Sequence, residues 1–385
     1  MKKNVITTLL GAAFAALALN AQAAEVSIRG MYDVGLKYAF ADDGVAGTTD
    51  SLSMASGLLD GSRVSLSAHE DLSPDLSVGF IAESGFQTDS GAFTVDNTLF
   101  SLGSMLYVSH KTAGELWAGR IGTIRSGATP AGWQIFGQRT SPFGSGWDGY
   151  GAGALYAMPF IGFNVDNALM YKTPVVNGFQ LNVEYSFGGM DGGTENQADT
   201  DRYSAAALTY DCGALRLVGS VEYVNENSKA GARTDELALA FGGSVNLNGT
   251  TLYGWAQWFR GADQVIALSG VENYALFDGL DHVDGWAAAL SAKIPAGAGF
   301  VDVALSYMDA EAKDDFTAAQ AQTNVRRLKR IGATAAYEYP LSKTTTLYTS
   351  AGVYKDRTTY DAGASDAAAR SPLAGQLTAG VHINF

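Results

Sequence analysis

The charged residues best placed to do chemistry lie in the one long irregular stretch of the chain, residues 121–166. This stretch carries Arg125, Arg139 and Asp148. It also carries eight aromatic residues: Trp133, Phe136, Phe143, Trp147, Tyr150, Tyr156, Phe160 and Phe163. Disordered segments are poor in aromatics, and loops longer than about 12–15 residues are usually functional when they are ordered. We therefore predict an ordered, packed loop whose fixed charges act on ions and polar solutes by electrostatics.

The motifs expected of an enzyme do not occur in the sequence. There is no Gly-x-Ser-x-Gly or His-Glu-x-x-His motif, and Cys212 is the only cysteine. Gly144, Gly146 and Gly149 have the spacing of a dinucleotide fingerprint, but they do not join a strand to a helix in a βαβ unit. The four histidines (His69, His110, His282 and His382) are scattered. We expect no enzymatic activity, no cofactor and no metal site, and the net charge of −14 argues against nucleic acid as a partner.

The elements around the irregular stretch alternate between apolar and polar residues with a period of two, as β-strands do. The segments 178–187 and 375–385 alternate over their whole length. Repeated segments of about ten residues with this pattern are typical of transmembrane barrels. We predict sixteen strands: 25–40, 58–70, 76–88, 97–110, 115–121, 167–174, 178–187, 202–211, 214–225, 235–247, 250–260, 284–294, 299–309, 329–339, 345–356 and 375–385. The expected fold is an all-β, antiparallel transmembrane β-barrel with a long third loop, 121–166, folded into the lumen.

The connections between these strands are alternately short and long. The short ones include Asn248-Gly249, a strong signal for a two-residue hairpin. The long ones include 41–57, 121–166, 261–283 and 310–328. Short periplasmic turns and longer extracellular loops are the layout of outer-membrane barrels. A soluble β-sandwich would also alternate, but no linker divides this chain and the loop asymmetry runs along its full length.

The first 23 residues are predicted to be a cleaved signal peptide. Lys2 and Lys3 precede an apolar run from Ile6 to Leu19, and Ala21-Gln22-Ala23 is a small-residue cleavage site. Residues 24–385 are then a single barrel domain. Removing the two lysines changes the net charge from −14 to −16, because −14 − 2 = −16. One cysteine permits no internal disulfide, and no later stretch has about 18 consecutive apolar residues.

Strand parity predicts which charges face the lumen, where water tolerates them. The expected lumen charges are Arg29, Asp33, Lys37, Arg63, Glu83, Glu184, Arg216, Glu222, Lys293, Asp302, Arg330, Glu338 and Lys355. Tyr348 and Tyr354 are expected among the aromatic girdles at the membrane interfaces. The basic run from Arg326 to Arg330 is expected at an extracellular loop end, where it is either a solvated face or a contact for lipopolysaccharide phosphates.

Four passages resemble a known family: Val26–Leu36, Ser62–Leu72, Leu116–Arg120 with Asp166–Pro174 after the long loop, and the final Phe385. Together they resemble the general bacterial porins of the Gram-negative outer membrane. The resemblance implies a homotrimer of sixteen-stranded barrels that pass small hydrophilic solutes passively. It also implies contact with outer-membrane lipid and lipopolysaccharide, and recognition of the C-terminal strand ending in Phe385 by the barrel-assembly machinery.

The resemblance extends only in part to the residues that narrow the pore. Arg63 matches a wall arginine of the family constriction, whereas Ser104 and Asn164 stand where other wall arginines are expected. The loop motif of the family is present as Pro142-Phe143-Gly144-Ser145-Gly146, which lacks its glutamate.

We hypothesise that Arg63, Arg125, Arg139 and Asp148 meet near the narrowest point of the pore. The alternative is that Arg125 and Arg139 pair locally at the loop mouth. With basic groups predominant in the loop, we predict weak ion selectivity and no strong cation preference. A channel biased towards sugars or organic anions, in which Trp133, Phe136, Trp147 and Tyr150 stack on the solute, is a second hypothesis, and a structural or adhesive barrel is a third.

Overall fold

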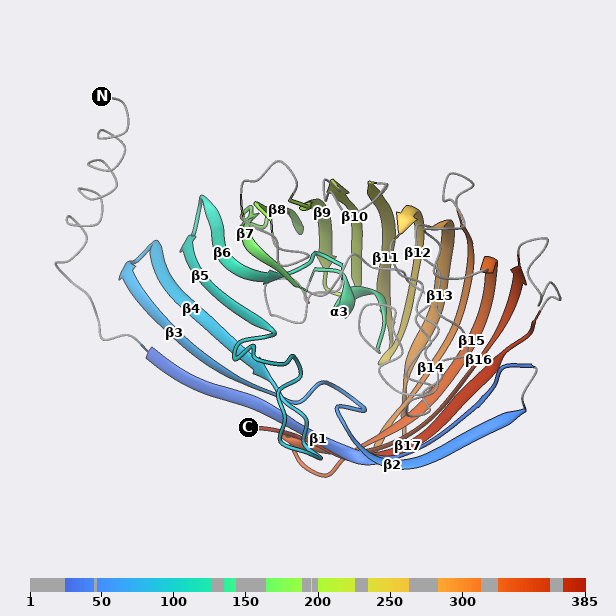
Figure 1. Cartoon of the computed structure of the whole chain (residues 1–385). Helices are drawn as coiled ribbons and strands as arrows, with labels where there is room; N and C mark the ends of the chain where they lie inside the picture. The colour runs from blue at the N-terminus through green and yellow to red at the C-terminus, as the bar shows by residue number, and fades with distance from the viewer. Residues whose placement is uncertain are drawn as a thin grey trace.

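The computed structural model of this chain describes residues 25–44, 47–125, 135–142, 164–188, 195, 200–225, 235–262, 283–312, 325–360 and 370–385. Nearly all of these residues belong to one antiparallel sheet that curves into a barrel (Figure 1). The signal-peptide prediction falls outside the described residues. No helix in the described ranges is long and apolar enough to cross a membrane.

The first strands are β1 (Glu25–Asp42), β2 (Thr48–Ser56), β3 (Arg63–Ser73), β4 (Leu76–Gly85), β5 (Gly103–His110) and β6 (Gly114–Gly122). After the short helix α3 (Gly137–Thr140) come β7 (Asn164–Lys172), β8 (Phe179–Ser186), β9 (Arg202–Cys212), β10 (Leu215–Asn225), β11 (Glu236–Leu247) and β12 (Thr250–Ala262). The wall is completed by β13 (Val283–Ala296), β14 (Gly299–Ala312), β15 (Val325–Pro340), β16 (Thr345–Tyr360) and β17 (Leu373–Asn384).

The barrel closes through its first and last strands. Residues 31–42 of β1 pair with β17, from Met31 opposite Asn384 to Asp42 opposite Leu373. The other edge of β1 is shared, because β3 pairs with residues 25–31 and β2 pairs with residues 34–42. The seventeen strands found in the described ranges therefore occupy sixteen positions around the ring. The prediction of a closed sixteen-stranded antiparallel barrel is confirmed.

The second position of the ring differs in detail from the sequence prediction. Residues 48–56, expected inside a loop, form β2, and the strand expected at 58–70 begins later, at Arg63. Residues 57–62 separate the two pieces and have no strand structure. Gly57 has a φ of +65°, a conformation that L-residues with a Cβ adopt rarely. The break in alternation at Gly57-Leu58-Leu59 is the physical reason for the split.

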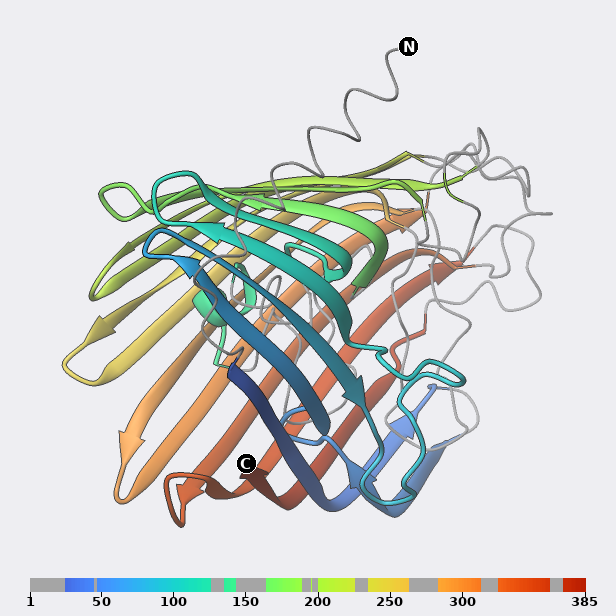
Figure 2. The ribbon, with the colours of Figure 1, turned by 90° about the vertical axis from the view of Figure 1, so that its left-hand side faces the viewer.

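Tight hairpins gather at one end of the tilted strands (Figure 2). Asn248 and Gly249 connect β11 to β12 with φ values of +54° and +94°. Left-handed conformations at both central residues define the type I′ turn, whose twist matches that of the flanking strands. Asn177 and Gly178 have similar values before β8, at +52° and +87°. In an outer-membrane barrel, short turns of this kind are expected at the periplasmic end.

The two faces of the wall differ as a barrel in lipid requires. Leu290 and Leu305 are 71% and 65% exposed on the outward face. Asp302, Arg330 and Asp356 are almost fully buried on the inward face. A large cluster of buried apolar residues joins the inward face of β9–β12 to Ile124, Ile135 and Phe136. The main apolar core therefore lies inside the barrel, between the wall and these inward residues.

Candidate pore constriction

The described parts of the long loop, residues 121–125 and 135–142, lie against the inside of the barrel wall. Figure 1 shows α3 within the ring of strands, and α3 contacts β10, β11 and β12. Phe136 is fully buried, and Ile135 is nearly so. A Cβ at Gly242 of β11 would lie 2.7 Å from Cγ2 of Thr140, so the missing side chain permits the close approach. Residues 126–134 and 143–163 of the loop fall outside the described residues.

Arg125 is held by a buried ion pair with Glu222 of β10, and both side chains are 1% exposed. The backbone N–H of Arg125 donates to Glu222 Oε1 at 3.4 Å, and the Tyr203 hydroxyl donates to the same oxygen at 2.7 Å. The N–H of Ile124 donates to the Tyr203 oxygen at 3.2 Å. This network ties the start of the loop to β9 and β10. Glu184 of β8 is buried on the same inward face.

Arg139 has a different anchor. Its Nη2 lies 2.6 Å from Oδ2 of Asp211, and its Nη1 donates to the carbonyl of Ile135 at 2.9 Å. Arg216 donates from Nε to the other oxygen of Asp211 at 3.1 Å. Arg216 is opposite Asp211 in the ladder, and Glu222 is six residues farther along β10. At about 3.3 Å per residue, the anchors of Arg125 and Arg139 are about 20 Å apart along the strand.

Arg63 belongs to a second segment that folds inward, residues 57–62 between β2 and β3. Arg63 Nη2 pairs with Asp60 Oδ2 at 2.8 Å. The buried carboxylate of Asp33 on β1 accepts from the N–H groups of Leu58 and Leu59 at 2.9 and 3.3 Å. Strand parity predicted that Asp33 lies on the inner wall, but it gave no sign that residues 57–62 bind to this carboxylate. The sequence feature that could have indicated this contact is the pair of adjacent leucines, Leu58 and Leu59, which interrupts the strand alternation.

Two further wall residues complete the site around Asp33. The Tyr348 hydroxyl donates to Asp33 Oδ1 at 2.7 Å, and His382 Nδ1 lies 3.2 Å from Oδ2. Asp33 thus connects β1, β16, β17 and the inward segment 57–62. Because every contact involves a buried carboxylate oxygen, this carboxylate fixes the segment to the wall.

The remaining wall charges predicted from parity lie on the inward face, except Lys355 of β16. Arg330 makes a two-pronged ion pair with Asp356, with both N–O distances at 2.8 Å, and its guanidinium lies 4.3 Å from the centre of the Tyr354 ring. Glu83 accepts a hydrogen bond from Ser65, and Arg29 is exposed and donates to Ser27 at 3.1 Å.

One parity assignment was wrong on β16. Tyr348 and Tyr354, expected at the girdles, are buried on the inward face, and Lys355, expected in the lumen, is exposed on the outward face. Tyrosine suits both a membrane interface and a polar wall, because its ring is apolar and its hydroxyl is not. Assigning the tyrosines to the lipid side therefore inverted the parity of this strand.

The three described arginines of the hypothesised constriction bond to three different carboxylates: Asp60, Asp211 and Glu222. Asp148 lies outside the described residues, as do Trp133, Trp147 and Tyr150. Phe136 is fully buried, so it offers no surface on which a solute could stack. No group of three or more His, Cys, Asp or Glu side chains within the described ranges could hold a metal ion.

Comparison with known proteins agrees with this geometry. The family model described as Gram-negative porin matches residues 7–359. The chain belongs to the Gram-negative porin family. An outer membrane porin protein of Bordetella pertussis is 29% identical to this porin over 388 residues, covering 90% of this chain and 93% of the relative.

Two solved structures show the same fold as this porin. An anion-selective porin from Comamonas acidovorans has a TM-score of 0.63 at 21% identity and covers 94% of this chain and 100% of its own. The trimer form of OmpT from Vibrio cholerae has a TM-score of 0.61 at 16% identity with the same coverage. This porin is an outer-membrane channel for small hydrophilic solutes and ions, as the resemblance implied.

Proposed function

We propose that segment 121–166 narrows this diffusion channel, that Arg63, Arg139 and Asp148 line the narrow part, and that Arg125 holds the loop in place through its buried pair with Glu222. The supporting observation is the anchoring of the loop: Arg125 is paired with Glu222, and Arg139 with Asp211. The anchors lie on the inward face of the neighbouring strands β9 and β10. Passive diffusion needs no further machinery, and we infer no enzymatic activity.

We infer weak ion selectivity from the same pairs. An arginine beside a carboxylate presents little net charge to a passing ion, and Arg63, Arg125 and Arg330 each have such a partner, whereas Arg139 shares Asp211 with Arg216. The net charge of the mature chain, −16 after subtraction of Lys2 and Lys3, favours cations only at long range. Charges farther away than a Debye length of about 8 Å are largely screened.

The test is single-channel recording in planar bilayers with a reversal potential measured across a salt gradient. The comparison is between wild type, a deletion inside Gly127–Trp147 and a deletion of equal length inside residues 264–281, in a different long loop. Larger steps for the first deletion alone would support narrowing by the third loop. Equal steps for all three proteins would refute it.

A channel biased towards particular solutes remains the second candidate function. The Comamonas acidovorans porin of the same fold is anion-selective. In this chain Phe136 is buried, which removes one of the four aromatics that sugar stacking would use. Two results would favour a solute-biased channel over a weakly selective one. The first is a reversal potential close to the chloride equilibrium value. The second is block of the wild-type current steps by one sugar or organic anion.

We further propose the assembly that the family resemblance implied. Cleavage after Ala23 would leave residues 24–385 as a single barrel domain, and three copies would form a homotrimer like the trimer form of the Vibrio cholerae protein. The barrel-assembly machinery would recognise β17 through Phe385, and outer-membrane lipid, including lipopolysaccharide, would surround the wall. Nucleic acid is not a partner. Mass spectrometry of the intact exported protein measures the cleavage site, and light scattering in detergent measures the number of copies.

A further inference from the structure

The inward segment 57–62 lies across the lumen from the described part of the third loop. The segment leaves the wall beside β1, between β2 and β3, whereas α3 contacts β10, β11 and β12. With β1 as position 1 and with β2 and β3 sharing position 2, β10 is position 9 of the sixteen-position ring. The two sites are therefore eight positions apart, by 9 − 1, which is half of the ring, and Figure 1 shows both inside it.

The segment enters the lumen far from either end of the barrel. On one side of it β2 has nine residues, and on the other side β3 has eleven. A residue rises about 3.3 Å along a strand, or about 2.5 Å along the barrel axis at a tilt of about 40°. The segment is thus about 22 Å from one end of this wall position and about 27 Å from the other. It lies at mid-height, where an obstacle limits the width of the whole pore.

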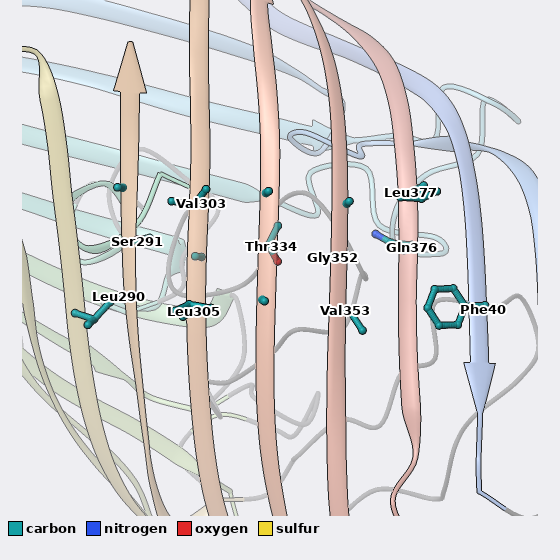
Figure 3. Close-up of a pocket in the computed structure, with 15 residues that line it drawn as sticks. Phe40, Leu290, Ser291, Val303, Leu305, Thr334, Gly352, Val353, Gln376 and Leu377 are labelled. Carbon is teal, nitrogen blue, oxygen red and sulfur yellow. The ribbon is translucent and has the colours of Figure 1, made fainter. Parts of the chain in front are cut away.

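The segment forms a second layer of chain on the lumen side of the wall. Leu58 packs against Ala336 of β15 and Tyr348 of β16, and all three are buried. The other face of the same part of the wall is the outer one, where Val353 and Leu377 line an apolar pocket (Figure 3). Layers packed face to face on a sheet are about 10 Å apart. Residues 57–62 therefore take about that width from the lumen.

Both ends and the middle of the segment are fixed to one residue, Asp33 of β1. The N–H of Gly57 donates to the Asp33 carbonyl at 3.1 Å. The Ser62 hydroxyl donates to the same carbonyl at 3.1 Å and accepts from the Asp33 N–H at 2.9 Å. The N–H groups of Leu58 and Leu59 donate to the Asp33 carboxylate between these two ends. A segment held at three places on a buried residue keeps one position, so it forms a fixed obstacle and not a moving flap.

Asp60 is the charge that this obstacle presents. It is the only charged residue among residues 57–62. Its side chain is 32% exposed, whereas that of its ion-pair partner Arg63 is 14% exposed. Glu83 of the adjoining wall is buried and accepts from Ser65. A passing ion therefore meets the Asp60 carboxylate more directly than it meets Arg63 or Glu83.

We propose that residues 57–62 form a second constriction, opposite the third loop, and that the Asp60 carboxylate faces the ions that pass it. This inference rests on the proposed function, because it requires an open diffusion channel. Within that channel it identifies a narrowing element that is independent of the third loop. It also identifies Asp60 as a further residue on which ion preference depends.

The first test changes the charge and measures the reversal potential across a salt gradient. The variants are Asp60→Asn, Arg63→Met and D60N/R63M, and the matched control is Asp50→Asn, which removes an exposed acid from the outward face of β2. A unit charge about 4 Å from an ion in water changes the local concentration of that ion about fivefold. We expect Asp60→Asn to lower the cation-to-anion permeability ratio by up to about fivefold. Arg63→Met should raise the ratio, and the double variant and Asp50→Asn should stay close to wild type.

The second test changes the width without a change of charge during the measurement. Asp60→Cys is made in a Cys212→Ser background, because Cys212 is exposed and would react as well. Benzyl methanethiosulfonate, a neutral reagent, then adds a bulky group to the thiol, and mass spectrometry verifies complete modification. Single-channel conductance should fall in one step. Asp50→Cys in the same background is the control, and its modification should leave the conductance unchanged.

Unchanged conductance after modification of Asp60→Cys would overturn the second constriction. A reversal potential of Asp60→Asn equal to that of wild type would overturn the role of its carboxylate. The deletion inside Gly127–Trp147 separates this proposal from the proposed function. Larger steps for that deletion, with no effect of the changes at Asp60, would leave the proposed function in place and remove the second constriction alone. A wild-type protein without conductance would count against both.

Discussion

Replacing Glu222 with Gln tests the anchor of the third loop most directly. Arg125 would remain charged and buried, because its side chain is 1% exposed and has Glu222 as its ion-pair partner. Removing one member of a buried pair typically costs about 3–5 kcal/mol. If about 3 kcal/mol of this destabilises the docked loop, the ratio of undocked to docked loop rises about 100-fold, since 1.4 kcal/mol is a factor of ten.

The assay for Glu222→Gln is the frequency of brief sub-conductance transitions in single-channel records, with the reversal potential measured in parallel. Glu83→Gln is the matched control, because Glu83 is another buried wall carboxylate but lies on β4, where Ser65 donates to it. Both substitutions should move the reversal potential towards anions. Only Glu222→Gln should increase the transitions, and the double variant R125M/E222L should remove them, since an apolar pair can replace a buried ion pair. Identical records from Glu222→Gln and Glu83→Gln would refute the anchoring role of this pair.

Three other expectations follow from the inward contacts. Asp33→Ala should lower the thermal unfolding temperature and raise conductance, because the N–H groups of Leu58 and Leu59 lose their acceptor. Asp33→Asn keeps an acceptor oxygen and should have a smaller effect, and the reverse order would contradict the reasoning. Asp211→Asn should shift the reversal potential towards anions, because Arg139 and Arg216 lose a shared counter-charge. An unchanged potential would mean that these arginines do not face the ion path. Arg330→Met should destabilise the barrel by about 3–5 kcal/mol by leaving Asp356 unpaired, and R330M/D356L should recover most of it in thermal unfolding. Equal unfolding temperatures for the single and double variants would argue against a buried charge as the cause.

The sequence predicted the wall well because alternation is local information. Each strand carries its own two-residue period, and turns such as Asn248-Gly249 identify themselves through residues that tolerate positive φ. The even number of predicted strands then indicated that the sheet closes into a barrel. The long loop 121–166 was predicted from the absence of this pattern, because its residues do not alternate between apolar and polar and many of them are aromatic.

Errors arose where a local pattern had two meanings. On β16, tyrosines alternate with small and charged residues, and a shift of one residue exchanges the two faces of a strand. Tyr354 faces inward beneath Arg330 and Lys355 faces outward, an arrangement that only the pairing with β15 and β17 settles. Contacts between residues that are distant in the chain could not be predicted from the sequence either. Arg125 and Glu222 are 97 residues apart, and a single sequence contains no sign that they meet.

The contacts of Asp33 impose an order on assembly. Asp33 lies on β1, but two of its partners, Tyr348 and His382, come from β16 and β17, more than 300 residues later. Contacts so distant in sequence form late in folding, because a long chain must first be brought together. The carboxylate of Asp33 can therefore complete its contacts only after the last strand has joined the first. A chain halted before β17 would have an open barrel, and the carboxylate that holds residues 57–62 would lack its contact with His382.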